Sequence, residues 1–124
     1  MTTKETEHIL MKLENGILWF HYKPGSIDID EAKQVVQDRV EFTQGEILPV
    51  LIVDDGVTKM SKTARDYLSS KAGTQNISAA AVVITSPFSK LIINFILKIN
   101  RPDIPVRIFT KEDEALVWLQ RLKS

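Results

Sequence analysis

The stretch LPVLIVDD (48–55) decides the fold of this chain. It is an apolar run too short for a helix and rich in β-branched residues, so it is typical of a strand buried on both faces. The stretches ISAAAVVITS (77–86) and IPVRIFT (104–110) have the same character. Strands of this kind belong to parallel sheets, so the three segments predict the centre of an α/β fold.

Helices are predicted around these strands. Four segments repeat their apolar residues at helical spacing: SIDIDEAKQVVQDRVEF (26–42), SKTARDYLSSKAG (61–73), SPFSKLIINFILKIN (86–100) and TKEDEALVWLQRLK (110–123). Capping residues mark three of the starts. Asp28 with Glu31 and Thr110 with Asp113 form capping boxes, and Ser61 is a simple N-cap.

The N-terminal part predicts an antiparallel hairpin. HILMKLENGILWFHYKPG (8–25) reads as two strands around Asn15-Gly16, because both turn residues tolerate positive φ. The expected order is therefore ββαβαβαβα, an α/β fold with a mainly parallel sheet, an N-terminal antiparallel hairpin and helices covering the sheet. We expect a single domain over residues 1–124, with residues 1–6 forming a loose N-terminus.

Composition excludes several classes of protein. The chain has 124 residues, which is enough for one domain with its own core. Its formal net charge is zero, so there is no general electrostatic attraction to nucleic acid. Cysteine is absent, which excludes disulfides and thiolate metal sites. We see neither a signal peptide nor a transmembrane segment, and we expect a cytoplasmic protein.

Sequence signatures of enzymes are missing. No glycine-rich loop follows a predicted strand, so the phosphate cradles of nucleotide-binding motifs are absent. His8 and His21 lie on opposite limbs of the hairpin, with no metal-ligand spacing around them. No serine occupies a strand–turn–helix nucleophile elbow. We therefore expect no enzymatic activity, no cofactor and no metal.

The acidic pair Asp54 and Asp55 allows two interpretations. Carboxylates at the end of a parallel strand can hold Mg²⁺, as they do after a similar strand in response-regulator receiver domains. Here the next strand leads directly to Thr85, and no phosphoacceptor aspartate comes between. The pair is therefore better explained as a turn that leaves the strand.

The segment 87–99 is more apolar than one covered helix face requires. One side is expected to cover the sheet, and the rest to meet a second copy of the chain or an apolar ligand. The candidate interface or ligand residues are Phe88, Leu91, Ile92, Phe95, Ile96 and Ile99.

The loop before the second predicted helix is a candidate regulatory site. Thr58, Ser61 and Thr63 bring hydroxyl groups to a helix N-terminus, and Arg65 follows them. A phosphate there would be stabilised by unbonded N–H groups and by the helix dipole. The alternative is that Ser61 is only an N-cap.

Two longer strings resemble a known family: VDDGVTKMSKTARDYL (53–68) and ITSPFSKLIINFILKINRPDIPVRIFTKEDEALVWL (84–119). With the predicted element order, the chain resembles the STAS, or SpoIIAA-like, fold of anti-sigma-factor antagonists and stand-alone bacterial STAS/SEC14-like domains of unknown function. In the antagonists a serine of an Asp-Ser-Ser-Gly motif is phosphorylated. The resemblance puts Thr63 at that serine, while Ser61, Lys62 and Ala64 replace the other residues of the motif.

The resemblance implies a non-enzymatic regulatory or protein-interaction module, which we expect to be homodimeric and to bind a regulatory protein partner. The alternative, implied by the SEC14-like relatives, is a domain that binds a small apolar ligand or lipid with helix 87–99 as a pocket wall.

Overall fold

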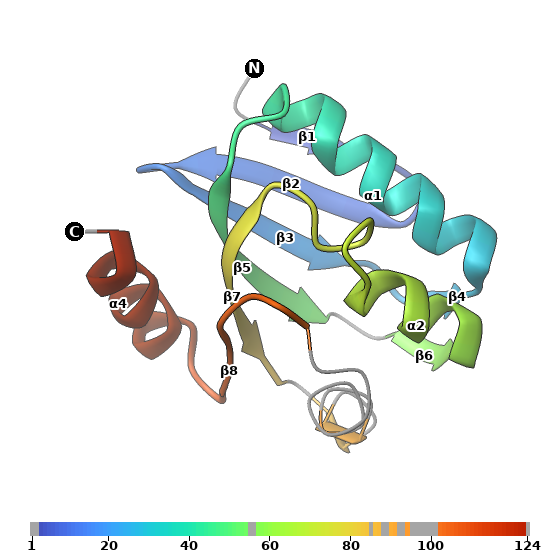
Figure 1. Cartoon of the computed structure of the whole chain (residues 1–124). Helices are drawn as coiled ribbons and strands as arrows, with labels where there is room; N and C mark the ends of the chain where they lie inside the picture. The colour runs from blue at the N-terminus through green and yellow to red at the C-terminus, as the bar shows by residue number, and fades with distance from the viewer. Residues whose placement is uncertain are drawn as a thin grey trace.

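The computed structural model describes residues 3–54, 57–84, 86–87, 90–91, 94 and 102–123 (Figure 1). Within these ranges the strands are β1 (Thr3–Glu5), β2 (Ile9–Glu14), β3 (Ile17–Tyr22), β4 (Gly25–Ile27), β5 (Leu48–Asp54), β6 (Val57–Met60), β7 (Ile77–Val83) and β8 (Val106–Phe109). The helices are α1 (Ile29–Thr43), α2 (Lys62–Ser69) and α4 (Glu112–Lys123).

The main sheet confirms the expected α/β fold. In the described part of the chain it has six strands in the order β1-β2-β3-β5-β7-β8. The strands β1, β2 and β3 pair antiparallel, whereas β3-β5, β5-β7 and β7-β8 pair parallel. The β2–β3 turn consists of Asn15 and Gly16, both with positive φ, as the hairpin signal predicts.

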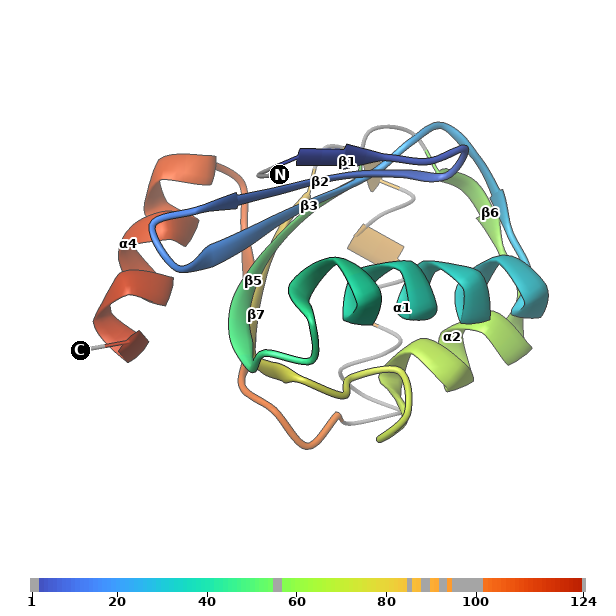
Figure 2. The same ribbon diagram turned by 90° about the horizontal axis from the view of Figure 1, so that it is seen from above.

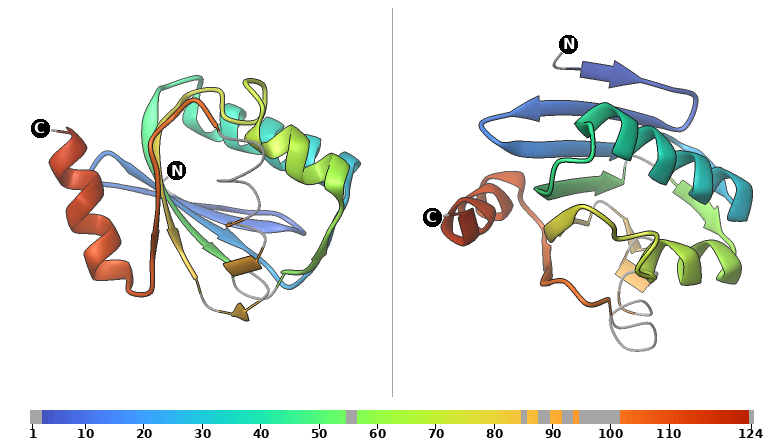
Figure 3. Two further views of the ribbon diagram at one scale, coloured as in Figure 1. Left: turned by 60° about the horizontal axis from the view of Figure 1, so that its bottom comes forward. Right: turned by 45° about the horizontal axis from the view of Figure 1, so that its top comes forward.

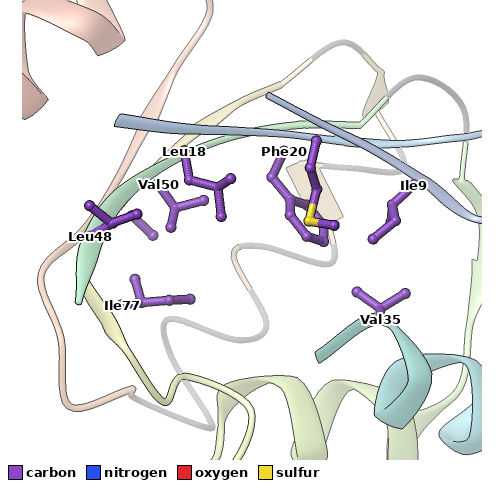
Figure 4. Packing of buried hydrophobic residues seen from close by; sticks show 9 residues of the cluster. Ile9, Leu18, Phe20, Val35, Leu48, Val50 and Ile77 are labelled. Atoms are coloured by element: carbon purple, nitrogen blue, oxygen red, sulfur yellow. The ribbon is translucent and has the colours of Figure 1, made fainter. Parts of the chain in front are cut away.

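Helices cover both faces of this sheet. The helices α1 and α2 lie side by side on one face, and α4 lies on the other (Figures 2 and 3). Successive side chains of β5 lie on opposite faces of the sheet, because the side chains of a strand point alternately in opposite directions. Val50 packs in a cluster with Val35 of α1 (Figure 4). Leu51 packs with Ala115 and Leu119 of α4.

The two caps of α1 explain its bounds. The Asp28 side chain accepts a backbone hydrogen bond, and the Glu31 side chain accepts one from the Asp28 N–H at 2.9 Å, so the predicted capping box is confirmed. At the other end Gln44 is left-handed with a φ of 54°, and the N–H of Gly45 donates to the carbonyl of Val40 at 3.1 Å.

The start of α4 corrects the second predicted capping box. The helix begins at Glu112, and the N–H of Ala115 donates to the carbonyl of Lys111 at 3.2 Å. Lys111 therefore holds the N-cap position that Thr110 was expected to hold. The Asp113 carboxylate instead accepts from the neighbouring Glu114 N–H at 2.9 Å, within the first turn.

Three further expectations are corrected. Residues 3–5, expected to be loose, form β1, which Lys23 fastens by bonding Glu5 and the carbonyl of Thr6. The segment 104–110 gives the short strand β8, which is half-buried because it lies at the edge of the sheet. The short parallel strands β4 and β6 were not predicted at all, and they form a second small sheet.

We expect Leu119→Ala to lower the free energy of unfolding by about 2–5 kcal/mol, because the side chain is fully buried and leaves a cavity against the sheet. Leu122→Ala on the same helix is the control, since Leu122 is 48% exposed, and it should cost less than about 1 kcal/mol. Urea denaturation measures both. Equal losses would contradict the placement of α4.

Candidate functional site

The small β4–β6 sheet brings the N-termini of α1 and α2 together. The strand β4 leads into α1, β6 leads into α2, and the two strands pair parallel. The N–H of Ser61 then donates to the carbonyl of Ile27 at 3.1 Å, which carries the pairing up to the helix starts. Both helices consequently begin at the same end of the helical layer (Figures 1 and 2).

A buried apolar cluster also holds the starts of α1 and α2 together. Ile27 and Val57 of the two strands pack with Ala32 of α1 and Ala64 of α2, and all four side chains are buried. Small alanines at the contact let the two helices approach closely. The helix starts are therefore held by packing as well as by hydrogen bonds.

The N-cap side chains of the two helices are hydrogen-bonded to each other. The hydroxyl of Ser61 donates to Oδ1 of Asp28 at 2.6 Å and accepts from the N–H of Ala64 at 3.1 Å. The same Oδ1 accepts from the N–H of Ile29 at 2.8 Å. The hydroxyl of Thr63 lies 3.1 Å from that of Ser61. We call Asp28, Ser61 and Thr63 the N-cap cluster.

Hydrogen bonds to the charged carboxylate favour ionisation of Asp28. The Ser61 hydroxyl, followed by the Ile29 N–H, holds the pKa of Asp28 below its ordinary value. The Thr63 hydroxyl and the positive charge of Lys59 act in the same direction. The N-cap cluster therefore consists of an ionised carboxylate and two hydroxyl groups where the starts of α1 and α2 meet.

The predicted loop residues have different places. Ser61 and Thr63 belong to the N-cap cluster, and Thr63 is exposed. Thr58 lies in β6, and Arg65 is half-buried in the first turn of α2. The sequence identified Asp28 only as a cap of its own helix, because nothing in the sequence indicated that β4 and β6 would pair.

Most of the predicted interface helix lies outside the described residues. Phe88, Ile92, Phe95, Ile96 and Ile99 are among the residues that the structure does not describe. The described residues of this segment include Pro87, Lys90, Leu91 and Asn94, which are helical. The Leu91 side chain is 69% exposed. The role of the segment 87–99 as an interface or pocket wall stays a prediction.

A hydrogen bond of Asp54 supports the interpretation of the acidic pair as a turn. Oδ1 of Asp54 accepts a hydrogen bond from the N–H of Val57 at 2.7 Å, as a turn-forming aspartate does. Asp55 lies outside the described residues. Among the residues that are described, no three His, Cys, Asp or Glu side chains form a group suited to a metal ion. No described helix has the length and apolar character needed to cross a membrane.

We expect Ser61→Ala to lower the free energy of unfolding by about 1 kcal/mol, since it removes the N-cap bond to Ala64. Ser78→Ala is the control, because Ser78 is exposed on β7, and its effect should stay within about 0.5 kcal/mol. Urea denaturation at neutral pH compares them. A Ser61→Ala variant as stable as the control would contradict the capping role.

Ser61→Ala should also raise the pKa of Asp28, measured by carboxyl ¹³C NMR titration. In the native protein this pKa is lowered, so the carboxylate stabilises the fold at pH values above its unfolded pKa, and that contribution is lost as pH falls through the folded pKa. The variant should therefore lose less stability on acidification. Thr63→Val should give a smaller rise, and an unchanged pKa in both would contradict the geometry.

Comparison with a solved structure confirms the resemblance in fold. The crystal structure of an uncharacterized DUF3478 family protein with a SpoIIAA-like fold, from Shewanella loihica PV-4, has a TM-score of 0.63 and 15% identity, covering 94% of this chain and 98% of that one. A protein with unknown function from Arthrobacter sp. FB24 is 24% identical over 89% of this chain and 97% of its own, with a TM-score of 0.32.

No curated protein matches this sequence. The similarity to the Shewanella protein establishes the SpoIIAA-like fold and no activity, because the identity is low. The family model DUF7793, a domain of unknown function, matches residues 11–123. The chain therefore belongs to the DUF7793 family.

Proposed function

We propose that this chain is a regulatory protein-interaction module without enzymatic activity, which works as a homodimer in the cytoplasm. The observation that carries the proposal is the N-cap cluster, where hydrogen bonds between side chains join the starts of α1 and α2. The SpoIIAA-like fold adds support. The sequence resemblance to the anti-sigma-factor antagonists also puts Thr63 at the serine that is phosphorylated in those proteins.

A change of charge at Thr63 is the physical basis for regulation. Thr63 is exposed and is the second residue of α2, so a modifying enzyme can reach its hydroxyl. A phosphate there would carry a charge of about −2 and would be attracted by the N-terminus of α2. It would also be repelled by the ionised Asp28, whose contact with Ser61 it would strain. The modification would therefore alter the joint between the helices and leave the apolar cluster below it intact.

Leu91 supports a contact with a second copy. A large aliphatic side chain that is 69% exposed gains free energy when it is covered. It belongs to the segment whose apolar residues exceed what one buried helix face needs. A twofold contact through this segment would cover it in both copies.

Native mass spectrometry tests the dimer. The wild type should show twice the mass of the chain, and Leu91→Asp should shift the population towards the monomer, because a carboxylate would have to be buried at the contact. Leu122→Asp is the matched control on α4 and should stay dimeric. A monomeric wild type, or equal effects of both substitutions, would contradict this part of the proposal.

Affinity purification from the host organism tests the regulatory part. We expect a protein retained by the wild type and by Thr63→Val to be lost or weakened at least about tenfold with Thr63→Glu, which adds the charge. Thr63→Val is the control because it removes the hydroxyl without adding charge. Identical retention by wild type and Thr63→Glu would contradict switching at Thr63, and no retained protein would contradict the interaction function.

A further inference from the structure

A cavity of about 130 Å³ lies between the sheet and the α1–α2 layer. Its described lining is mainly apolar and includes Ile52, Met60, Leu68, Ile77, Val82 and Val106. A dry apolar cavity of about 150 Å³ is large enough to hold benzene. This cavity therefore has room for an apolar group of about that size.

One wall of the cavity carries a buried cation. Arg39 of α1 lines it and is only 6% exposed. Its Nη1 donates to the carbonyl of Gly73 at 3.2 Å and its Nη2 to that of Gln75 at 2.7 Å. Both acceptors are neutral, and among the described residues Arg39 makes no ion pair.

Among the described residues, the buried guanidinium has only neutral hydrogen-bond partners. Burial lowers the pKa of Arg39, yet an arginine side chain stays protonated in proteins. A desolvated cation that has only neutral partners costs free energy, which an anion beside it would offset. The two carbonyl bonds fix the guanidinium in place, so less entropy is lost when a further acceptor binds.

A phenol lies at the same cavity. Tyr22 lines it, and burial raises the pKa of Tyr22 to about 12, so the hydroxyl is neutral near pH 7 and can donate a hydrogen bond. The charge of Arg39 opposes that rise and the charge of Asp54 adds to it. The cavity thus combines a cation and a neutral donor with apolar walls.

We propose that this cavity binds a small apolar carboxylic acid of about six or seven carbons, with the carboxylate on Arg39 and the hydrocarbon against the sheet. A planar carboxylate matches the guanidinium, and its single charge equals that of the arginine. A dianion such as phosphate would leave one charge unpaired among apolar side chains. This binding site is independent of the interaction function proposed above.

Isothermal titration calorimetry with hexanoate and benzoate tests the proposal, with hexan-1-ol and benzyl alcohol as uncharged partners of the same size. We expect each acid to bind at least about tenfold more tightly than its alcohol, because a charged acceptor strengthens the hydrogen bonds. Absence of acid binding, or equal affinities for acid and alcohol, would overturn the proposal.

Two variants locate the site. Val82→Phe should fill the cavity and abolish acid binding, and circular dichroism should show that the variant still folds. Arg39→Met should remove the preference for the acid over the alcohol. Arg107→Met is the control, since Arg107 is exposed on β8 and lines no part of this cavity. If Arg39→Met does not fold, Val82→Phe decides. Undiminished acid binding by a folded Val82→Phe would overturn the proposal.

Discussion

Burial of both faces of β5 and β7 is the constraint on which the rest of this structure depends. The side chains of these strands alternate between two apolar clusters, one under α1 and one under α4. A sheet with two apolar faces is stable in water only when both are covered. On one face the cover is α1 and α2, which lie in the connections from β3 to β5 and from β5 to β7. On the other face it is α4, which follows β8.

This constraint also creates the candidate regulatory site. With α4 on one face, α1 and α2 share the other and begin at the same end. The pairing of β4 with β6 then sets the two helix starts beside each other. Two capping groups that would otherwise serve separate helices become hydrogen-bond partners, since Ser61 donates to Asp28. We therefore expect a change at one helix start to alter the other.

Patterns in the sequence were sufficient for the main elements and insufficient for the contacts between them. The apolar runs predicted β5 and β7, and Asn15-Gly16 predicted the hairpin, because these signals are local. Thr110 was misassigned because the helix begins one residue later than the capping-box pattern places it. The strands β4 and β6 are short and lie far apart in the sequence, so no local periodicity indicates that they pair.

Arg39 shows the same limit for side chains. The buried stripe of α1 runs through Val35, Val36, Arg39 and Thr43, so a charged residue occupies a core position. A charged residue of a surface helix is expected to face the solvent. The burial of Arg39 is explained by its hydrogen bonds to two carbonyls of the α2–β7 connection. The partners come from residues more than thirty positions away, which the local pattern cannot include.

A double-mutant cycle between Asp28→Ala and Ser61→Ala, measured by urea denaturation at pH 7, tests the central claim most directly. Each single variant removes its own cap as well as the link between the helices, and the cycle isolates the link. If the two helix starts act as one unit, the double variant should lose less stability than the sum of the single losses. Additive losses within experimental error would contradict the account.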